Sequence, residues 1–432
     1  MKLILIILLF PFFIFGQKNR SATLAEYMQA QVDINNFSGT VLVSKDGHVL
    51  LKKAYGLADY EWNIKNTIDT KFQLASVTKQ FTATAILLLI EKGKLSLDDK
   101  LSKFLPDYPR ADSVTIHMLL SHTSGLAMGF KEIAVSSMDK DSAYAKIKKM
   151  PYEFSPGTKS GYSNIGYYLL AKIIEKVSGE KYAAFLKKNI FEKAGMKNTD
   201  VSNNESIVEK KAKAYYHTEN GLIHNPYINW EINVGHDGVY STVEDLALWD
   251  KALYGTGILS AQMKKLMFTP YGTENWGYGF IINPFYNHGH QLIAHDGGFF
   301  GTMTSFNRFT DDKLFVTVLS NNESFSYIIS YGLSAIALGK EVELPYKHHR
   351  IEIDPSLYDQ YVGTYDKITI LKTDGKLYFN STEMELIPES KTKFFRADNH
   401  DRTIEFIPDS KGLYNSIILT KGGVKEVIRR NK

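Results

Sequence analysis

The stretch Phe72-Gln-Leu-Ala-Ser-Val-Thr-Lys-Gln-Phe-Thr-Ala-Thr-Ala-Ile86 sets a hydroxyl and an amine three residues apart at the start of a strongly apolar helix. Because a helix turns once in about 3.6 residues, Ser76 and Lys79 share one face and their side chains can meet. A lysine held in an apolar pocket loses its charge readily and can then take the proton of a serine. The stretch predicts a nucleophile and its base. The alternative is a capping serine followed by a solvated lysine.

Composition describes an ordinary globular protein. The chain has 432 residues, 44% of them hydrophobic and 23% charged, which suggests two domains with a large core. A net charge of +4 without basic clusters gives no sign of a nucleic-acid partner. The absence of cysteine excludes a cysteine nucleophile and thiolate metal sites. No cofactor is expected.

The N-terminus carries one lysine, Lys2, followed by an almost unbroken apolar run to Phe15. Residues 1–16 are predicted to be a signal peptide, with Gly16 as the small residue at the cleavage position. An uncleaved anchor is the alternative, because Ile14 is bulky for that cleavage pattern. The chain is therefore expected to be periplasmic or secreted, without a transmembrane span in its mature part.

Alternating apolar residues at both ends of a long segment indicate strands. Residues 37–55 predict a hairpin around Lys45-Asp46-Gly47. Further strands and a closing helix are predicted at residues 278–282, 291–294, 301–308, 313–320 and 327–338. The helical patterns lie between these two groups, so residues 21–342 are predicted to form an α/β (α+β) domain. Its antiparallel sheet would be flanked by helices and carry an inserted all-helical lobe.

The sequence pattern changes near Val342. A polar connector leads into about eight short alternating runs separated by turn residues. Residues 350–432 are therefore predicted to be a small antiparallel β domain, either a barrel or a sandwich.

Two later motifs could complete a site with Ser76. Tyr162-Ser163-Asn164 is predicted in a turn just before a helix, where a phenol can point into a cleft. Tyr227-Ile-Asn229 is a second copy of the same pattern, but it lacks the preceding Pro-Gly turn and the following apolar helix. His295-Asp296-Gly297-Gly298 is expected to lead into a strand, and its alternative interpretation is a core histidine bonded to a backbone carbonyl.

The order Ser-x-x-Lys, Tyr-x-Asn, His-x-Gly resembles the serine hydrolase superfamily that includes class C β-lactamases, penicillin-binding proteins, D-aminopeptidases and esterases. The resemblance covers roughly residues 35–339 and implies a β-lactamase/transpeptidase-like fold. It implies that Ser76 forms an acyl-enzyme while Lys79 and Tyr162 share the acid and base steps. Asn164 would bond the lysine and substrate.

The resemblance also implies a site for the oxyanion. The backbone N–H groups of Ser76 and Gly298 would stabilise the charge that develops on the carbonyl oxygen. Gly297 and Gly298 would let substrate approach the strand closely.

One departure from the family pattern is His295, where β-lactamases of this superfamily usually carry lysine. A histidine can stay neutral, which disfavours efficient hydrolysis of a carboxylate-bearing β-lactam. The predicted function is an exported serine hydrolase acting on an ester or amide, as an esterase or a D-amino-acid or peptidoglycan-type peptidase. The alternative is a penicillin-binding sensor or scaffold with slow or no turnover.

His288-Gly-His290 places two imidazoles close together, as in a metal site, but no third ligand stands at a recognisable spacing, so no metal is expected. The expected partner is a small-molecule or peptide substrate. A monomer is expected because the sequence shows no heptad seam.

Overall fold

The computed structural model describes residues 11–218 and 220–431, in two compact units. One unit is formed by residues 37–327, and the other joins the chain before residue 37 to residues 328–432. The signal-peptide prediction falls largely on residues outside the described part. The predicted domain boundaries at residues 342 and 350 stay predictions.

The larger unit is built on a six-stranded antiparallel sheet whose strands come from both ends of its sequence. In spatial order the strands are β10 (Ile281–Ile282), β11 (Leu292–Phe299), β12 (Thr302–Phe309), β13 (Leu314–Ser320), β1 (Gly39–Lys45) and β2 (His48–Tyr55). Val41 lies opposite Val318, so the first strand pairs with the last strand of the unit. The mixed α/β fold predicted from the alternation is confirmed.

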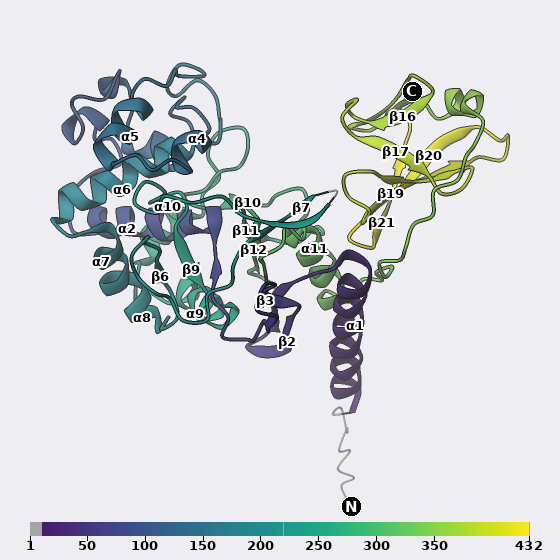
Figure 1. The fold of residues 1–432 in the computed structure, drawn as a ribbon, viewed down its shortest axis with the longest axis horizontal. Helices are drawn as coiled ribbons and strands as arrows, with labels where there is room; N and C mark the ends of the chain where they lie inside the picture. Colours follow the sequence, from purple (N-terminus) through teal and green to yellow (C-terminus); the bar gives the residue numbers. More distant parts are fainter. Residues whose placement is uncertain (1–10, 219, 432) are drawn as a thin grey trace, which may run out of the picture. The chain divides into compact units, whose positions relative to one another are not determined.

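Helices fill the segment between these strands and gather on the left side of Figure 1. They are α2 (Lys79–Glu91), α3 (Ile116–Leu120), α4 (Lys131–Ala134), α5 (Lys140–Ile147), α6 (Asn164–Ser178), α7 (Tyr182–Leu186), α8 (Glu192–Ala194), α9 (Val243–Tyr254) and α10 (Ala261–Met267). Helix α2 is buried from Lys79 to Leu89 and packs against α6, so it forms the centre of the core. An all-round apolar sequence is what such a central helix requires.

Short strands complete this unit. They are β3 (Leu57–Asp59), β4 (Ile64–Lys65), β5 (Phe72–Gln73), β6 (Asp200–Val201), β7 (Tyr215–Thr218), β8 (Gly221–His224) and β9 (Val239–Ser241). Strand β9 lies between β5 and β6, which places the segment before Val239 next to the segment before Ser76.

Two sequence expectations differ from the structure. The third motif lies inside β11, not ahead of a strand. Of the strand predicted at residues 278–282, only Ile281 and Ile282 are extended. Gly279 explains the second difference, because its φ is +74° and a Cβ there would lie 2.6 Å from the Lys79 carbonyl oxygen. The chain bends at that glycine to pass the start of α2.

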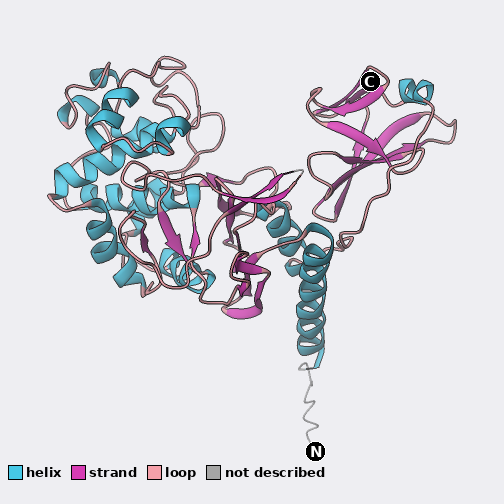
Figure 2. Ribbon diagram, viewed as in Figure 1, coloured by secondary structure: helices cyan, strands magenta, loops and turns pink. Residues whose placement is uncertain are grey.

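The C-terminal part forms an eight-stranded antiparallel barrel that is nearly closed, whose strands are drawn in magenta in Figure 2. Its strands are β14 (Gly363–Tyr365), β15 (Ile368–Thr373), β16 (Lys376–Phe379), β17 (Glu385–Pro388), β18 (Lys393–Arg396), β19 (Arg402–Pro408), β20 (Tyr414–Lys421) and β21 (Val424–Arg429). A bridge between Tyr365 and Arg430 joins the first strand to the end of the last. Of the two predicted forms, the barrel is confirmed.

Two helices belong to the same unit as the barrel. They are α1 (Pro11–Asn35) and most of α11 (Ser326–Ala337). Gln31 and Asn35 on α1 donate to the carboxylate of Asp401, at 2.9 and 2.8 Å. Within the part of the chain that the structure describes, no helix combines the length and apolar character needed to cross a membrane.

A buried ion pair ties the sheet to α9. Arg308 on β12 is 1% exposed, and its Nε lies 2.5 Å from Oδ1 of Asp250. Burial raises the pKa of Asp250 even with this arginine beside it. Removing the arginine therefore leaves a carboxylate that is costly to keep charged.

We expect Arg308→Met to lower the free energy of unfolding by about 3–5 kcal/mol, measured by chemical denaturation. The matched control is Lys52→Met, which breaks the exposed pair between β2 and Glu244 of α9. That change should cost less than about 1 kcal/mol because water screens the pair. Equal costs for the two variants would contradict the assignment of Arg308 and Asp250 as a buried structural pair.

Candidate active site

Ser76 lies in a 3-10 turn, Ala75–Thr78, that runs directly into α2. Side chains three residues apart eclipse in such a turn, so Ser76 and Lys79 stand one above the other. Lys79 Nζ lies 3.1 Å from Ser76 Oγ. Ala75 adopts a left-handed φ of +48°, a strained conformation of the kind that clusters at functional sites.

The amine of Lys79 is fully buried among neutral acceptors. Besides Ser76 Oγ it donates to Asn164 Oδ1 at 2.7 Å and to the carbonyl oxygen of His236 at 3.0 Å. Burial lowers the pKa of Lys79 to about 7, against the opposing charge of Asp237. Since lysine ordinarily titrates near 10.4, a large fraction of this amine is neutral at pH 7 and can accept a proton.

Tyr162 completes the contact around the serine hydroxyl. Its Oη donates to Ser76 Oγ at 2.7 Å, and Lys79 Nζ lies 4.8 Å from its ring centroid. Burial raises the pKa of Tyr162 well above its ordinary value, so the phenol is neutral and holds a proton. The predicted turn ahead of α6 is present, with Ser163 capping the helix by accepting from Gly166 N at 3.1 Å.

His122 supports Tyr162 from behind. Its Nδ1 accepts from the backbone N–H of Ser163 at 3.0 Å, and its ring centroid lies 4.6 Å from that of Tyr162. Burial lowers the pKa of His122 well below the ordinary range, so its ring is neutral. The structure makes His122 a positioning residue.

The third motif brings β11 against the segment that carries the nucleophile. A Cβ on Gly297 would lie 2.4 Å from the Leu74 carbonyl oxygen, so a glycine is needed for this approach. Thr304 Oγ1 donates to the same carbonyl at 2.8 Å. Gly298, the next residue, is exposed to solvent and borders a cavity, where its backbone can face a substrate.

His295 is buried in the same strand. Its Nδ1 donates to the Asp296 carbonyl oxygen at 2.6 Å, and its ring centroid lies 6.3 Å from that of Tyr162. Burial, with a smaller effect of Lys79, lowers the pKa of His295 to about 3. The residue is therefore neutral at physiological pH and supplies no fixed cation.

A cavity of about 570 Å³ opens beside these groups, hereafter the site cavity. Asn164 and Gly298 connect it to the Ser76 region. Its wall includes the aromatic side chains Phe130, Tyr216, Phe299 and Phe300, and the polar side chains Asn233, His236 and Asp237.

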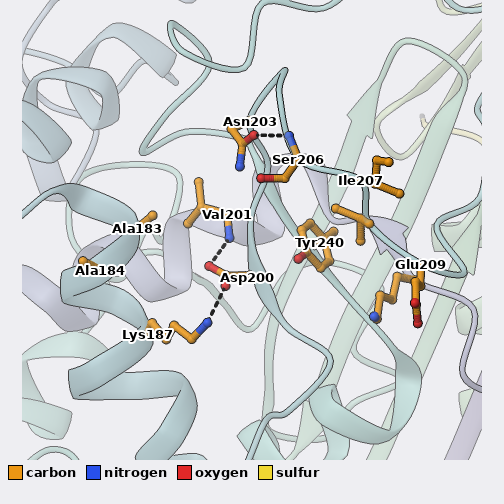
Figure 3. Close-up of a pocket in the computed structure, with 12 residues that line it drawn as sticks. Ala183, Ala184, Lys187, Asp200, Val201, Asn203, Ser206, Ile207, Glu209 and Tyr240 are labelled. Carbon is orange, nitrogen blue, oxygen red and sulfur yellow. Dashed lines mark hydrogen bonds and ion pairs between the residues drawn. The ribbon is translucent and has the colours of Figure 1, made fainter.

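A second hollow lies away from the nucleophile (Figure 3). Lys71, Lys187, Asp200 and Tyr240 line it, and Lys187 Nζ lies 3.1 Å from Asp200 Oδ2. Figure 3 shows this pair as adjacent side chains joined by a dashed line. None of the predicted site residues contributes to its wall, so this hollow is distinct from the predicted site.

The residues of the competing motifs have structural roles instead. Tyr227 is 56% exposed, while Asn229 donates to the carbonyl oxygens of Ser136 and Met138 and fixes a loop. His290 bonds Asp312 at 2.7 Å. Within residues 11–218 and 220–431, no cluster of three or more His, Cys, Asp or Glu side chains could hold a metal ion.

The fold and this arrangement define a class of protein with a Ser-Lys-Tyr constellation, its lysine buried, beside an antiparallel sheet. Residues 24–327 match the family described as beta-lactamase, so the chain belongs to the beta-lactamase family. The resemblance predicted from the three motifs is confirmed. Among its members the chain is penicillin-binding-protein-like.

Particular relatives support that narrower description. The chain is 30% identical to penicillin-binding protein 4* of Bacillus subtilis over 96% of its own length and 99% of the relative. The structure of a penicillin-binding protein from Bacillus halodurans is 28% identical, with a TM-score of 0.65, covering 73% of this chain and 98% of that one. An octameric homologue from Pyrococcus abyssi covers 94% of this chain and 99% of its own, at 27% identity and a TM-score of 0.69.

Because the pKa of Lys79 is lowered to about 7, we expect acylation to speed up as the pH rises through 7 and the amine loses its proton. Lys79→Arg keeps a permanent charge and should lose about 10²–10⁴-fold in rate without recovery at pH 9. Pre-steady-state release of p-nitrophenol from an ester between pH 5 and 9 measures both effects.

The chain offers a matched control in Lys211, whose Nζ donates to Ser202 Oγ at 2.9 Å and whose pKa burial lowers to about 8. Lys211→Arg should leave the rate within about threefold and its pH dependence unchanged. A rate of the wild-type protein that does not vary between pH 5 and 9 would argue against Lys79 as the base.

His122→Phe tests the support of Tyr162. The variant keeps a ring next to the phenol but loses the acceptor for Ser163 N–H, so the phenol should be held less firmly. We expect kcat to fall by roughly 10- to 100-fold with KM within about threefold. His117, which bonds Tyr278 Oη at 2.7 Å outside the site, gives the control His117→Phe. Similar kinetic losses in both variants would indicate a general effect of removing a buried histidine.

Proposed function

We propose that this chain is an exported serine hydrolase that forms an acyl-enzyme on Ser76. The observation that carries the proposal is the position of Ser76 Oγ, 3.1 Å from a buried amine and 2.7 Å from a half-buried phenol, beside an open cavity. Nucleophile, base and proton donor are thus within hydrogen-bond reach of one another.

The proposed reaction begins as Ser76 Oγ attacks the carbonyl carbon of an ester or amide while its proton passes to neutral Lys79. The backbone N–H groups of Ser76 and Gly298 stabilise the oxyanion. When the tetrahedral intermediate collapses, Tyr162 donates its proton to the leaving group, and Lys79 returns a proton to the phenolate. In deacylation a water molecule loses a proton to the same pair and attacks the acyl carbon. The bond from Ser76 Oγ to that carbon then breaks, and the pair returns the proton to Oγ, which restores the hydroxyl and releases the acid.

The electrostatics favour substrates other than carboxylate-bearing β-lactams. A lysine at the start of the third motif would be a fixed cation, whereas His295 is neutral and bonded to its own strand. We therefore favour an ester, or a D-amino-acid or peptidoglycan-type amide, as substrate. A structural relative of 22% identity, a D-amino acid amidase from Ochrobactrum anthropi, shares the fold at a TM-score of 0.65. Export rests on the N-terminal apolar run.

Ser76→Ala should lower ester turnover by roughly 10⁴-fold or more and abolish labelling by a fluorophosphonate probe, because no other group can carry the acyl intermediate. The matched control Ser206→Ala changes an exposed serine outside the site and should retain both. A panel of p-nitrophenyl esters, D-alanyl peptides and nitrocefin, followed by product release, should give nitrocefin the lowest kcat/KM. Retained turnover in Ser76→Ala would refute the mechanism.

A further inference from the structure

The deep wall of the site cavity presents hydrogen-bond acceptors. Asn233, His236 and Asp237 all line it and are at most 2% exposed. Oδ1 of Asn233 and Oδ1 of Asp237 are buried and make no hydrogen bond to any described residue. The Asn233 Nδ2 group is already used, since it donates to the carbonyl oxygens of Ala134 and Asn229 at 3.0 and 2.9 Å.

His236 adds a third acceptor. Its Nδ1 lies 3.2 Å from the Val234 carbonyl oxygen and must therefore carry the proton. The remaining ring nitrogen, Nε2, holds a lone pair and lies 3.4 Å from Asp237 Oδ2. Two acceptors that face each other at this distance need a donor, as does the unbonded oxygen of Asn233.

The other charged residues at the cavity do not donate hydrogen bonds to these acceptors. Lys131 is exposed and its Nζ lies 5.1 Å from the Phe300 ring centroid, while Glu323 accepts from the backbone N–H of His217 at 3.3 Å. Lys79 spends its donors on Ser76, Asn164 and the His236 carbonyl. A group with several N–H donors and a positive charge would satisfy the deep wall, and aromatic neighbours favour a cation as well.

We propose that the site cavity receives the acyl part of a substrate bearing a protonated primary amine, with Asp237 as the specificity-determining carboxylate and Asn233 and His236 as its neutral partners. The inference rests on the proposed hydrolysis at Ser76 and names its substrate class, an amino-acyl ester or amide with a free ammonium group. N-acylation of that amine removes both the charge and the donors, so it should weaken recognition.

The test compares alanine p-nitroanilide with N-acetylalanine p-nitroanilide, each as both enantiomers, through the ratio of their kcat/KM values. Hydrogen bonds to charged groups predict a ratio of roughly 10 to 100 in favour of the free amine for the preferred enantiomer. Asp237→Asn should bring the ratio to within about threefold of one. The matched control Glu323→Gln, at another carboxylate of the same cavity, should leave the ratio within about threefold of the wild-type value.

The ratio should also depend on pH. Burial raises the pKa of Asp237 to about 6, so its charge is lost as the pH falls below 6 while the substrate amine stays protonated. Preference for the free amine should therefore decline from pH 7.5 to 5. The charged or titratable groups that face Asp237 are Lys79 on α2, Tyr162 before α6 and neutral His236. Only the part of their effect on rate that both substrates share cancels in the ratio.

A binding measurement separates this inference from the hydrolase proposal. Calorimetry on Ser76→Ala protein should show tighter binding of alaninamide than of isobutyramide, in which a methyl group replaces the amine. Wild-type hydrolysis of both anilides at a ratio near one would overturn the amine inference and leave the hydrolase standing. Preferential binding of alaninamide without any hydrolysis would refute the hydrolase proposal and support the amine site. Equal binding of the two amides would overturn the amine site.

Discussion

The burial of one amine governs the arrangement of the site. Lys79 lies inside the core with Nζ bonded to a hydroxyl, an amide oxygen and a backbone carbonyl, all of them neutral. An ammonium in such surroundings is poorly solvated, and this drives the pKa of Lys79 down toward the pH at which a base is useful. The apolar sequence of α2 is thus part of the chemistry as well as part of the core.

The backbone carbonyl of His236 can accept a hydrogen bond from the Lys79 amine only because the chain passes close to that amine. A Cβ on Gly235 would lie 2.3 Å from the Tyr167 carbonyl oxygen, and the residue has a φ of +84°. This glycine lets the chain run between α2 and α6, so that the next residue, His236, presents its carbonyl to Lys79. Gly297 does the same for β11 beside Leu74. Because both close approaches require glycine, Gly235 and Gly297 help to determine which groups surround Lys79 and therefore its pKa.

The sequence predicted most of the fold and the three motifs because these depend on local patterns. Ser76 and Lys79 are three residues apart, and Asn164 follows Tyr162 in a recognisable turn before an amphipathic helix. It did not predict His122, whose neutral ring depends on burial that no spacing reveals. The sequence also did not predict Asp237 and Asn233. They lie 158 and 154 residues after Lys79 in the sequence, and only the fold brings them to the site. The sequence also did not predict that β11 continues through Gly297 and Gly298, because glycine has a low propensity for strands.

The charge states of His295 and Asp237 favour a cationic substrate over one that bears a carboxylate. On the strand side, His295 is neutral where related enzymes have a cation, so a substrate carboxylate finds no fixed partner there. Asp237, which also lines the cavity, brings a buried negative charge close enough to raise the pKa of Lys79. A cationic acyl group there would offset this carboxylate and so lower the pKa of Lys79 further. Substrate binding would then make the amine a more available base at the moment when Ser76 must lose its proton.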